Sequence, residues 1–142
     1  MGEEDIRRFM VQPWTMTCSD GDLVELGDGV PHPRAFGAFP RKLRRYVVEE
    51  KVLTLERAIH SMTGMPATVF RLPERGVLRV GAMADVAVFD LAAVRDAATY
   101  EDPHYHSEGM KVIIVNGRVA LEGGKVTGER AGRVLVKTVQ VK

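Results

Sequence analysis

The sequence predicts an α/β fold in which helices come first and short strands follow. Apolar residues recur every three or four positions over residues 2–10, 41–51 and 54–62, which is the period of an α-helix. From residue 75 onward, glycines separate short β-branched runs, a pattern typical of small β-structure. The dipeptide Asn116-Gly117 lies between two such runs and predicts a β-hairpin, because both residues tolerate the positive φ of a type I′ turn.

The composition is that of an ordinary globular domain. The chain has 142 residues, of which 45% are apolar and 27% charged, and a net charge of +1. So small a charge indicates neither a nucleic-acid partner nor an anionic membrane. One cysteine excludes an internal disulfide, and neither a membrane-spanning apolar run nor a signal peptide is present, so we expect a cytoplasmic protein.

The first part of the chain predicts a helix, a strand and a loop. The helix covers residues 2–10 and ends before Pro13. Residues 14–18 alternate large or apolar side chains with threonine, which predicts a strand that ends at Asp20. An acid at the end of a strand, beside a glycine turn, is where an α/β enzyme exposes a catalytic carboxylate. Glycines and prolines in residues 22–40 predict a long surface loop.

Two helices are expected next. In the first, from Arg41 to about Lys51, apolar residues share one face and we expect the basic run to lie on the solvated remainder. That run comprises Arg41, Lys42, Arg44 and Arg45. Since no stacking aromatic residues accompany it, we do not interpret it as a nucleic-acid site. Thr54 is a good N-cap for the second helix, and Gly64 follows that helix.

The second half predicts strands at residues 84–90, 111–115, 118–122 and 133–141. The pair at 111–115 and 118–122 flanks the Asn116-Gly117 turn. The pattern indicates a small β-structure rather than a closed barrel of its own.

Several blocks, taken in order, resemble the C-terminal part of N-acyl-D-amino-acid deacylases, or D-aminoacylases, of the amidohydrolase superfamily. The blocks are Ser19-Asp20-Gly21, 32–41, 62–67, 75–90 and 112–118. The later blocks are shared across the superfamily, dihydroorotases and hydantoinases included. The first turn, together with residues 32–34 and 101–104, is more particular to the D-aminoacylase branch. The likeness covers nearly the whole chain.

The resemblance implies a zinc-dependent hydrolase on a (β/α)₈ barrel with a small β-sandwich. Residues 1–72 would be the end of the barrel, with its last strand, active-site loop and helices, and residues 73–142 the C-terminal part of the sandwich. The family's metal-binding histidines and its ligand cysteine belong to segments that this chain does not contain. The resemblance therefore implies a fragment, from which we expect no catalysis alone.

The resemblance also implies roles for individual residues. Asp20 would act as general base and then general acid beside zinc, and is itself a possible metal contact. The implied substrate-binding residues, for a small N-acyl-D-amino acid, are Ser19, Gly21, His32 and Arg34, and Arg34 would bind a carboxylate. Cys18 is not the family's metal-binding cysteine. His104 and His106 form an HxH pair, but Pro103 interrupts any strand there, so we expect no metal ligation.

Two alternatives stay open. In the first, the chain is a non-catalytic module that self-associates, or packs on a partner, through unpaired sandwich edges. In the second, it belongs to another amidohydrolase, such as a dihydroorotase or hydantoinase.

Overall fold

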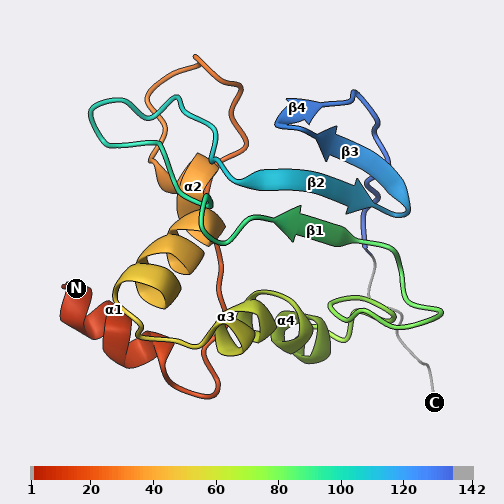
Figure 1. The fold of residues 1–142 in the computed structure, drawn as a ribbon, viewed down its shortest axis with the longest axis horizontal. Coiled ribbons are helices and arrows are strands. Elements are labelled where there is room, and N and C mark those ends of the chain that lie inside the picture. The colour runs from red at the N-terminus through yellow and green to blue at the C-terminus, as the bar shows by residue number, and fades with distance from the viewer. Residues whose placement is uncertain (1, 136–142) are drawn as a thin grey trace.

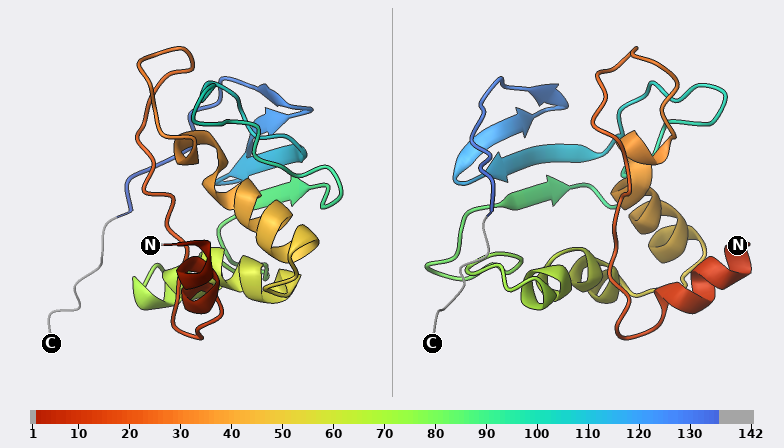
Figure 2. Two further views of the ribbon diagram at one scale, coloured as in Figure 1. Left: turned by 90° about the vertical axis from the view of Figure 1, so that its left-hand side faces the viewer. Right: turned by 180° about the vertical axis from the view of Figure 1, so that it is seen from behind.

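The computed structural model describes residues 2–135, in which helices gather along one side of a four-stranded sheet (Figures 1 and 2). The helices are α1 (Glu3–Met10), α2 (Arg34–Arg41), the π-helix η1 (Lys42–Glu49), α3 (Leu55–Met62) and α4 (Gly64–Val69). The strands are β1 (Val86–Phe89), β2 (Met110–Val115), β3 (Arg118–Glu122) and β4 (Lys125–Val126). No helix in this part of the chain is long and apolar enough to cross a membrane.

The sheet is antiparallel throughout, in the order β1-β2-β3-β4. The predicted hairpin is confirmed: Asn116 and Gly117 have φ values of 47° and 80°, as a type I′ turn requires. Strand β4 was not predicted. The strand predicted at 133–141 is absent over 133–135, and the rest of it lies outside the described residues.

A hydrogen-bonded network fixes the hairpin turn to the chain before β1. The Asp85 carboxylate accepts from the backbone N–H of Asn116 (2.8 Å) and pairs with Arg75, whose guanidinium also donates to Asn116 Oδ1 (2.7 Å). The N–H of Gly117 donates to the Ala84 carbonyl (2.9 Å). The segments 75–85 and 116–117 are therefore held together by direct contacts.

The loop predicted up to residue 40 is helical from Arg34 onward, where α2 begins. Helix α2 runs straight into η1, so one continuous helix covers residues 34–49. Pro40 has no N–H to donate to the Phe36 carbonyl, and Ser107 Oγ donates to that carbonyl instead (2.5 Å). The proline thus both precedes the π-helical stretch and leaves an acceptor that ties a distant segment to α2.

The strand predicted at residues 14–18 is wrong. These residues form no strand in the structure, although the Thr17 N–H donates to the Ser61 carbonyl (3.0 Å). A strand exists only where a second strand satisfies its backbone groups, and none of the described residues supplies that partner.

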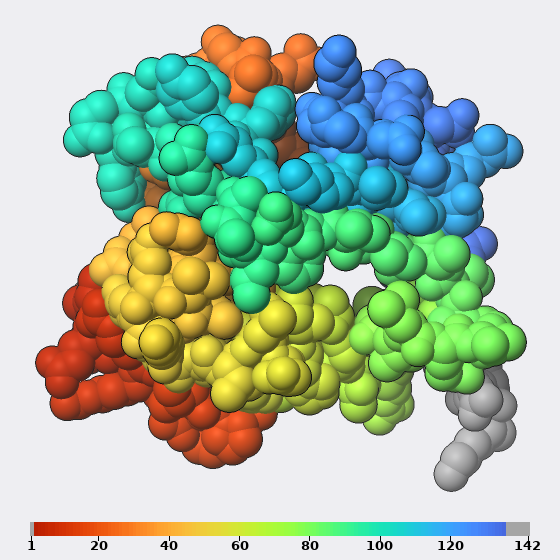
Figure 3. Space-filling model, viewed as in Figure 1, coloured from red at the N-terminus to blue at the C-terminus, as the bar shows by residue number. Residues whose placement is uncertain are grey.

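The core lies where the helices meet the chain after β1. The buried cluster consists of Leu43, Leu53, Ala58 and Val94. The space-filling view shows a hollow between α3 and α4 and the segment leading into β1 (Figure 3). Large apolar side chains remain exposed, among them Trp14 at 73%. The helical layer and the sheet therefore pack over a limited area.

Helix α1 has no buried residue; its last residue, Met10, packs against the core, and ion pairs link the helix to η1 and the residue that follows it. Glu50, just after η1, accepts from Arg7 Nε of α1 (2.7 Å) and from Arg45 Nε (2.7 Å). Hydrogen bonds from Arg7 and then Arg45 lower the pKa of the Glu50 carboxyl from 4.5 to about 2.

Acid is therefore expected to release α1. Because the pKa of Glu50 is lower in the folded state, its stabilising contribution is complete above pH 4.5 and is lost as the pH falls toward 2. Protection of the α1 amides from hydrogen exchange, expressed relative to the intrinsic exchange rate at each pH, should fall in acid across this range. In Glu50→Gln exchange should already be fast at neutral pH, whereas Glu49→Gln, whose carboxylate pairs with Arg44 on the same helix, should match the wild type. Identical profiles for Glu50→Gln and the wild type would contradict this account.

Candidate active site

Asp20 and Arg34 come together at the start of α2. Arg34 Nη2 lies 2.8 Å from Asp20 Oδ2, and the Asp20 side chain is 79% exposed. Asp20 has φ of 47°, a left-handed conformation that aspartate tolerates better than most residues. The turn thus presents an exposed carboxylate with a guanidinium beside it.

The glycine after Asp20 is required by a close backbone approach. A Cβ on Gly21 would lie 2.8 Å from the Cα of Ala35, closer than real Cβ contacts come. The Gly21 N–H points to Ser19 Oγ at 3.4 Å, a long contact that closes the turn locally. Gly21 is therefore explained by packing against α2, and Ser19 by the turn.

His32 organises the start of α2 rather than contacting Asp20. Its Nδ1 accepts from the backbone N–H of Arg34 (3.0 Å), and its Nε2 lies 2.9 Å from the Tyr100 hydroxyl. The two rings meet edge to face with centroids 5.0 Å apart. Since Nδ1 accepts a hydrogen bond, the neutral ring carries its proton on Nε2 and donates to Tyr100.

His104 holds the loop that precedes α2. Its Nδ1 accepts from the Gly27 N–H (3.0 Å), and its Nε2 lies 3.0 Å from the Gly29 carbonyl oxygen. These contacts explain why residues 22–33 lie beside residues 100–106 in the views of Figures 1 and 2. His106 packs edge to face on Phe36. Both rings therefore have structural roles that the sequence alone did not indicate.

A cavity of 610 Å³ opens beside the Asp20–Arg34 pair. His32, Arg34 and Tyr100 contribute to its wall, together with Arg41 and Tyr46. It brings two guanidinium groups and two phenols to one space, but the carboxylates of Glu3, Asp96 and Glu101 line it as well, and Asp96 neutralises Arg41 (3.2 Å). Arg34 is therefore the cation of this lining that could bind a ligand carboxylate. Tyr100 and Tyr46 were missed by the sequence analysis, since nothing in the local pattern brings residues so distant in the chain into one wall.

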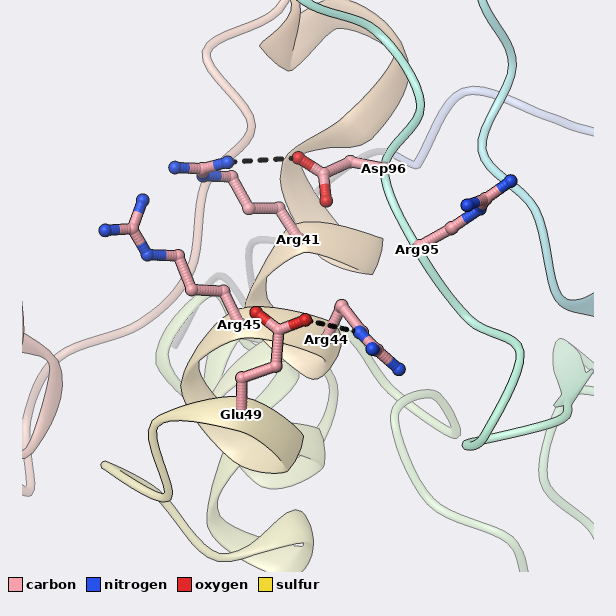
Figure 4. Close-up of a pocket in the computed structure, with 6 residues that line it drawn as sticks. All are labelled: Arg41, Arg44, Arg45, Glu49, Arg95 and Asp96. Atoms are coloured by element: carbon pink, nitrogen blue, oxygen red, sulfur yellow. Dashed lines mark hydrogen bonds and ion pairs between the residues drawn. The ribbon is translucent and has the colours of Figure 1, made fainter.

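A second pocket, of 410 Å³, is rich in arginine but internally neutralised (Figure 4). Figure 4 shows Arg41 paired with Asp96 (3.2 Å) and Arg44 paired with Glu49 (2.6 Å). The other two guanidinium groups are paired as well, Arg45 with Glu50 and Arg95 with Glu108. This pocket shares Arg41 with the cavity above but contains none of the predicted site residues, so we do not treat it as the active site.

Lys42 corrects the prediction of a fully solvated basic face. It is 4% exposed, and its Nζ donates to Thr17 Oγ1 (2.6 Å) and Ser61 Oγ (2.7 Å). Burial, and then the positive charge of Arg57, lower the pKa of the amine to about 8. The helix period placed this residue correctly on its helix, but its contacts come from Thr17 and from Ser61 of α3, both distant in the sequence.

The described residues do not form a metal site by themselves. Within residues 2–135 no three His, Cys, Asp or Glu side chains gather in a way that would hold a metal ion. Asp20 pairs with the guanidinium of Arg34, and Cys18 is an exposed cysteine that forms no disulfide. A zinc ion held by these residues alone does not fit the structure, because zinc sites use three or four protein ligands.

Comparison with known proteins identifies relatives of this chain. A family model described as "Amidohydrolase family" matches residues 5–121. An N-acyl-D-aspartate deacylase from Alcaligenes xylosoxydans xylosoxydans is 43% identical over 95% of this chain and 26% of its own length. A D-aminoacylase from the same organism is 42% identical over 97% of this chain and 28% of its own. A dihydroorotase from Lactobacillus acidophilus is 32% identical over 61% of this chain and 23% of its own. The chain thus spans about a quarter of the length of these relatives.

Solved structures agree with this relationship. A D-aminoacylase described as having a binuclear metal centre has a TM-score of 0.90 and 42% identity, over 96% of this chain and 28% of that one. An N-acyl-D-glutamate deacylase from Bordetella bronchiseptica, complexed with zinc and a phosphonate inhibitor that mimics the tetrahedral intermediate, has a TM-score of 0.80 and 43% identity. That match covers 88% of this chain and 26% of the other.

Proposed function

Because this chain belongs to the amidohydrolase family, we propose that it is the C-terminal portion of a zinc-dependent hydrolase that cleaves the amide bond of N-acyl-D-amino acids. The observation that carries the proposal is the exposed Asp20 carboxylate, held by Arg34 beside the 610 Å³ cavity. Identities above 40% to two deacylases over almost the whole chain support this activity over that of a dihydroorotase, which is less similar and matches a shorter stretch.

In this proposal Asp20 moves the proton of the reaction. Amide hydrolysis requires that a water molecule lose a proton as it attacks the carbonyl carbon and that the leaving nitrogen gain one. An exposed carboxylate serves both steps in turn, first as base and then as acid. When bound, zinc would supply an activated water. We propose that its ligands come from segments outside the described residues, so that the chain alone is inactive.

Arg34 is proposed to bind the carboxylate of the substrate. Only Nη2 of its guanidinium contacts Asp20 among the described residues, so the remaining donors can face the cavity. Such binding would place the substrate amide near Asp20, because one side chain contacts both. Ser19, Gly21 and His32 would contribute by shaping the turn and the start of α2. In the same proposal, residues 1–72 complete a barrel and residues 73–142 a β-sandwich.

The test is a hybrid in which this chain replaces the matching 28% of the D-aminoacylase. The hybrid with zinc is expected to hydrolyse N-acyl-D-amino acids and to leave dihydroorotate intact. Profiling N-acyl derivatives of D-aspartate, D-glutamate and neutral D-amino acids would identify the substrate class. The isolated chain is expected to show no turnover with zinc. Turnover by the isolated chain, or a folded hybrid that hydrolyses only dihydroorotate, would overturn the proposal.

A second candidate function is a non-catalytic module that packs on a partner or on itself. The 15.7 kDa chain exposes 10140 Å² of surface, whereas a folded monomer of that mass exposes about 7300 Å². Within the described residues the outer edges of β1 and β4 are also unpaired. Sedimentation equilibrium of the isolated chain tests this candidate: oligomers at micromolar concentration support it, and a stable monomer counts against self-association.

A further inference from the structure

Residues 17–21 lie against the continuous helix formed by α2 and η1. Near the start of the helix, Arg34 pairs with Asp20 at 2.8 Å. One residue further along both segments, Gly21 packs so closely on Ala35 that a Cβ would not fit. These two contacts hold the turn at one end.

The other end is held at Thr17, where three elements meet at one amine. Lys42, the first residue of η1, donates through Nζ to Thr17 Oγ1 (2.6 Å) and to Ser61 Oγ of α3 (2.7 Å). Ser61 in turn donates from its hydroxyl to the Ala58 carbonyl (2.8 Å) and accepts at its own carbonyl from the Thr17 N–H (3.0 Å). The amine therefore links η1, α3 and the segment that leads to Asp20.

Stability alone does not explain a lysine at this place. Among the described residues the hydrogen-bond partners of Nζ are two hydroxyl groups and no carboxylate, and the positive charge of Arg57 acts against the charged amine. Burial of an amine without a counter-charge is unfavourable, and buried lysines are rare unless paired. An apolar side chain would fill the same space without that free-energy cost. What lysine adds is a donor aimed at Thr17.

We propose that Lys42 is a positioning residue, which fixes Thr17 and thereby places the Ser19-Asp20-Gly21 turn relative to Arg34. The inference rests on the proposed function only for the chemical role of Asp20. Since Arg34 and Lys42 belong to one helix, the turn is held at both ends against a single rigid element. Without Lys42 the carboxylate keeps its partner Arg34, but Thr17, three residues before it, loses its side-chain contact and keeps only the backbone bond to the Ser61 carbonyl.

Hydrogen exchange of the Thr17 amide in the 142-residue chain tests this inference directly. In Lys42→Met, exchange at Thr17 is expected to be about tenfold faster than in the wild type. The Ala58 amide, whose N–H donates to the Thr54 carbonyl within α3, should be unchanged. The matched control is Lys51→Met, which removes an exposed lysine just beyond the same helix.

A conservative variant distinguishes a positioning role of Lys42 from a role in packing alone. Lys42→Gln keeps a side-chain donor and should restore much of the protection of Thr17, which a purely apolar replacement cannot do. If Lys42→Met does not fold, Thr17→Val is used instead, because it keeps the shape of the residue and removes only the acceptor. Unchanged exchange at Thr17 in the folded variant, or faster exchange at Ala58 to the same degree, would overturn the inference.

Activity gives a second and separable readout. In the hybrid protein, Lys42→Met is expected to lower kcat about tenfold with KM nearly unchanged, because the carboxylate is misplaced while the cavity keeps its cations. An inactive hybrid would contradict the proposed function but would leave the Thr17 measurement to decide on Lys42. A kcat equal to that of the wild type, with fast exchange at Thr17, would show that the contact holds the segment without serving catalysis, and would overturn the positioning role.

Discussion

Replacing Asp20 by asparagine is expected to lower kcat of the hybrid deacylase by about 10²–10⁴-fold. Asparagine has nearly the same shape as aspartate and keeps an oxygen for Arg34, 2.8 Å away in the wild type, so the substrate site should be retained and KM should change little. What disappears is a group that accepts and releases a proton. The measurement is kcat and KM at neutral pH with saturating zinc.

The control for this prediction is Asp22→Asn, which neutralises an exposed acid two residues further along. It should leave kcat within about twofold, because its charge is not placed beside Arg34. If Asp20→Asn keeps more than a tenth of the wild-type kcat, Asp20 does not act in the mechanism.

Gly109→Ala is expected to destabilise the chain by about 3 kcal/mol. Gly109 has φ of 87°, and a Cβ there would lie 2.5 Å from both the Cα and the N of Val94, which is fully buried. Because the obstructing atoms are backbone, no change of rotamer relieves the clash. Gly109 also accepts from the Asp90 N–H (2.9 Å), so a shift would disturb the connection between β1 and β2.

The control is Gly124→Ala. It distinguishes the free-energy cost of a positive φ from the cost of the steric clash between a Cβ and Val94. Gly124 has φ of 79°, but among the described residues no atom lies within 4 Å of the position that a Cβ would take, so its replacement should cost only about 1–2 kcal/mol. Urea denaturation of both variants gives the comparison. Equal losses of unfolding free energy would show that the contact with Val94 does not matter.

Elements whose cause is local were predictable. The Asn116-Gly117 turn and its two strands form because those residues accept positive φ, and they fold as expected. Thr54 caps α3 as predicted, its side chain accepting from the Arg57 N–H. In both cases the residues that determine the structure are within a few positions of one another.

Features that depend on a distant segment were not predictable. The alternation at residues 14–18 is a valid strand pattern, yet no described strand pairs with it. Lys42 is buried with its amine against Thr17 and Ser61, which the helix period of its own segment cannot reveal. The role of His104 in holding Gly27 and Gly29 depends on a loop more than seventy positions away.

Some features of the candidate site were likewise predictable from the sequence, and others were not. The sequence by itself indicated Asp20 and Arg34 as candidate site residues and the membership of the amidohydrolase family, because these depend on contiguous blocks of sequence. Only the tertiary structure decided that Arg34 pairs with Asp20, that Tyr100 supports His32 and that Lys42 holds Thr17. The physical reason is that a hydrogen bond or ion pair requires atoms within a few ångströms of each other, and the path of the folded chain alone brings such distant residues that close.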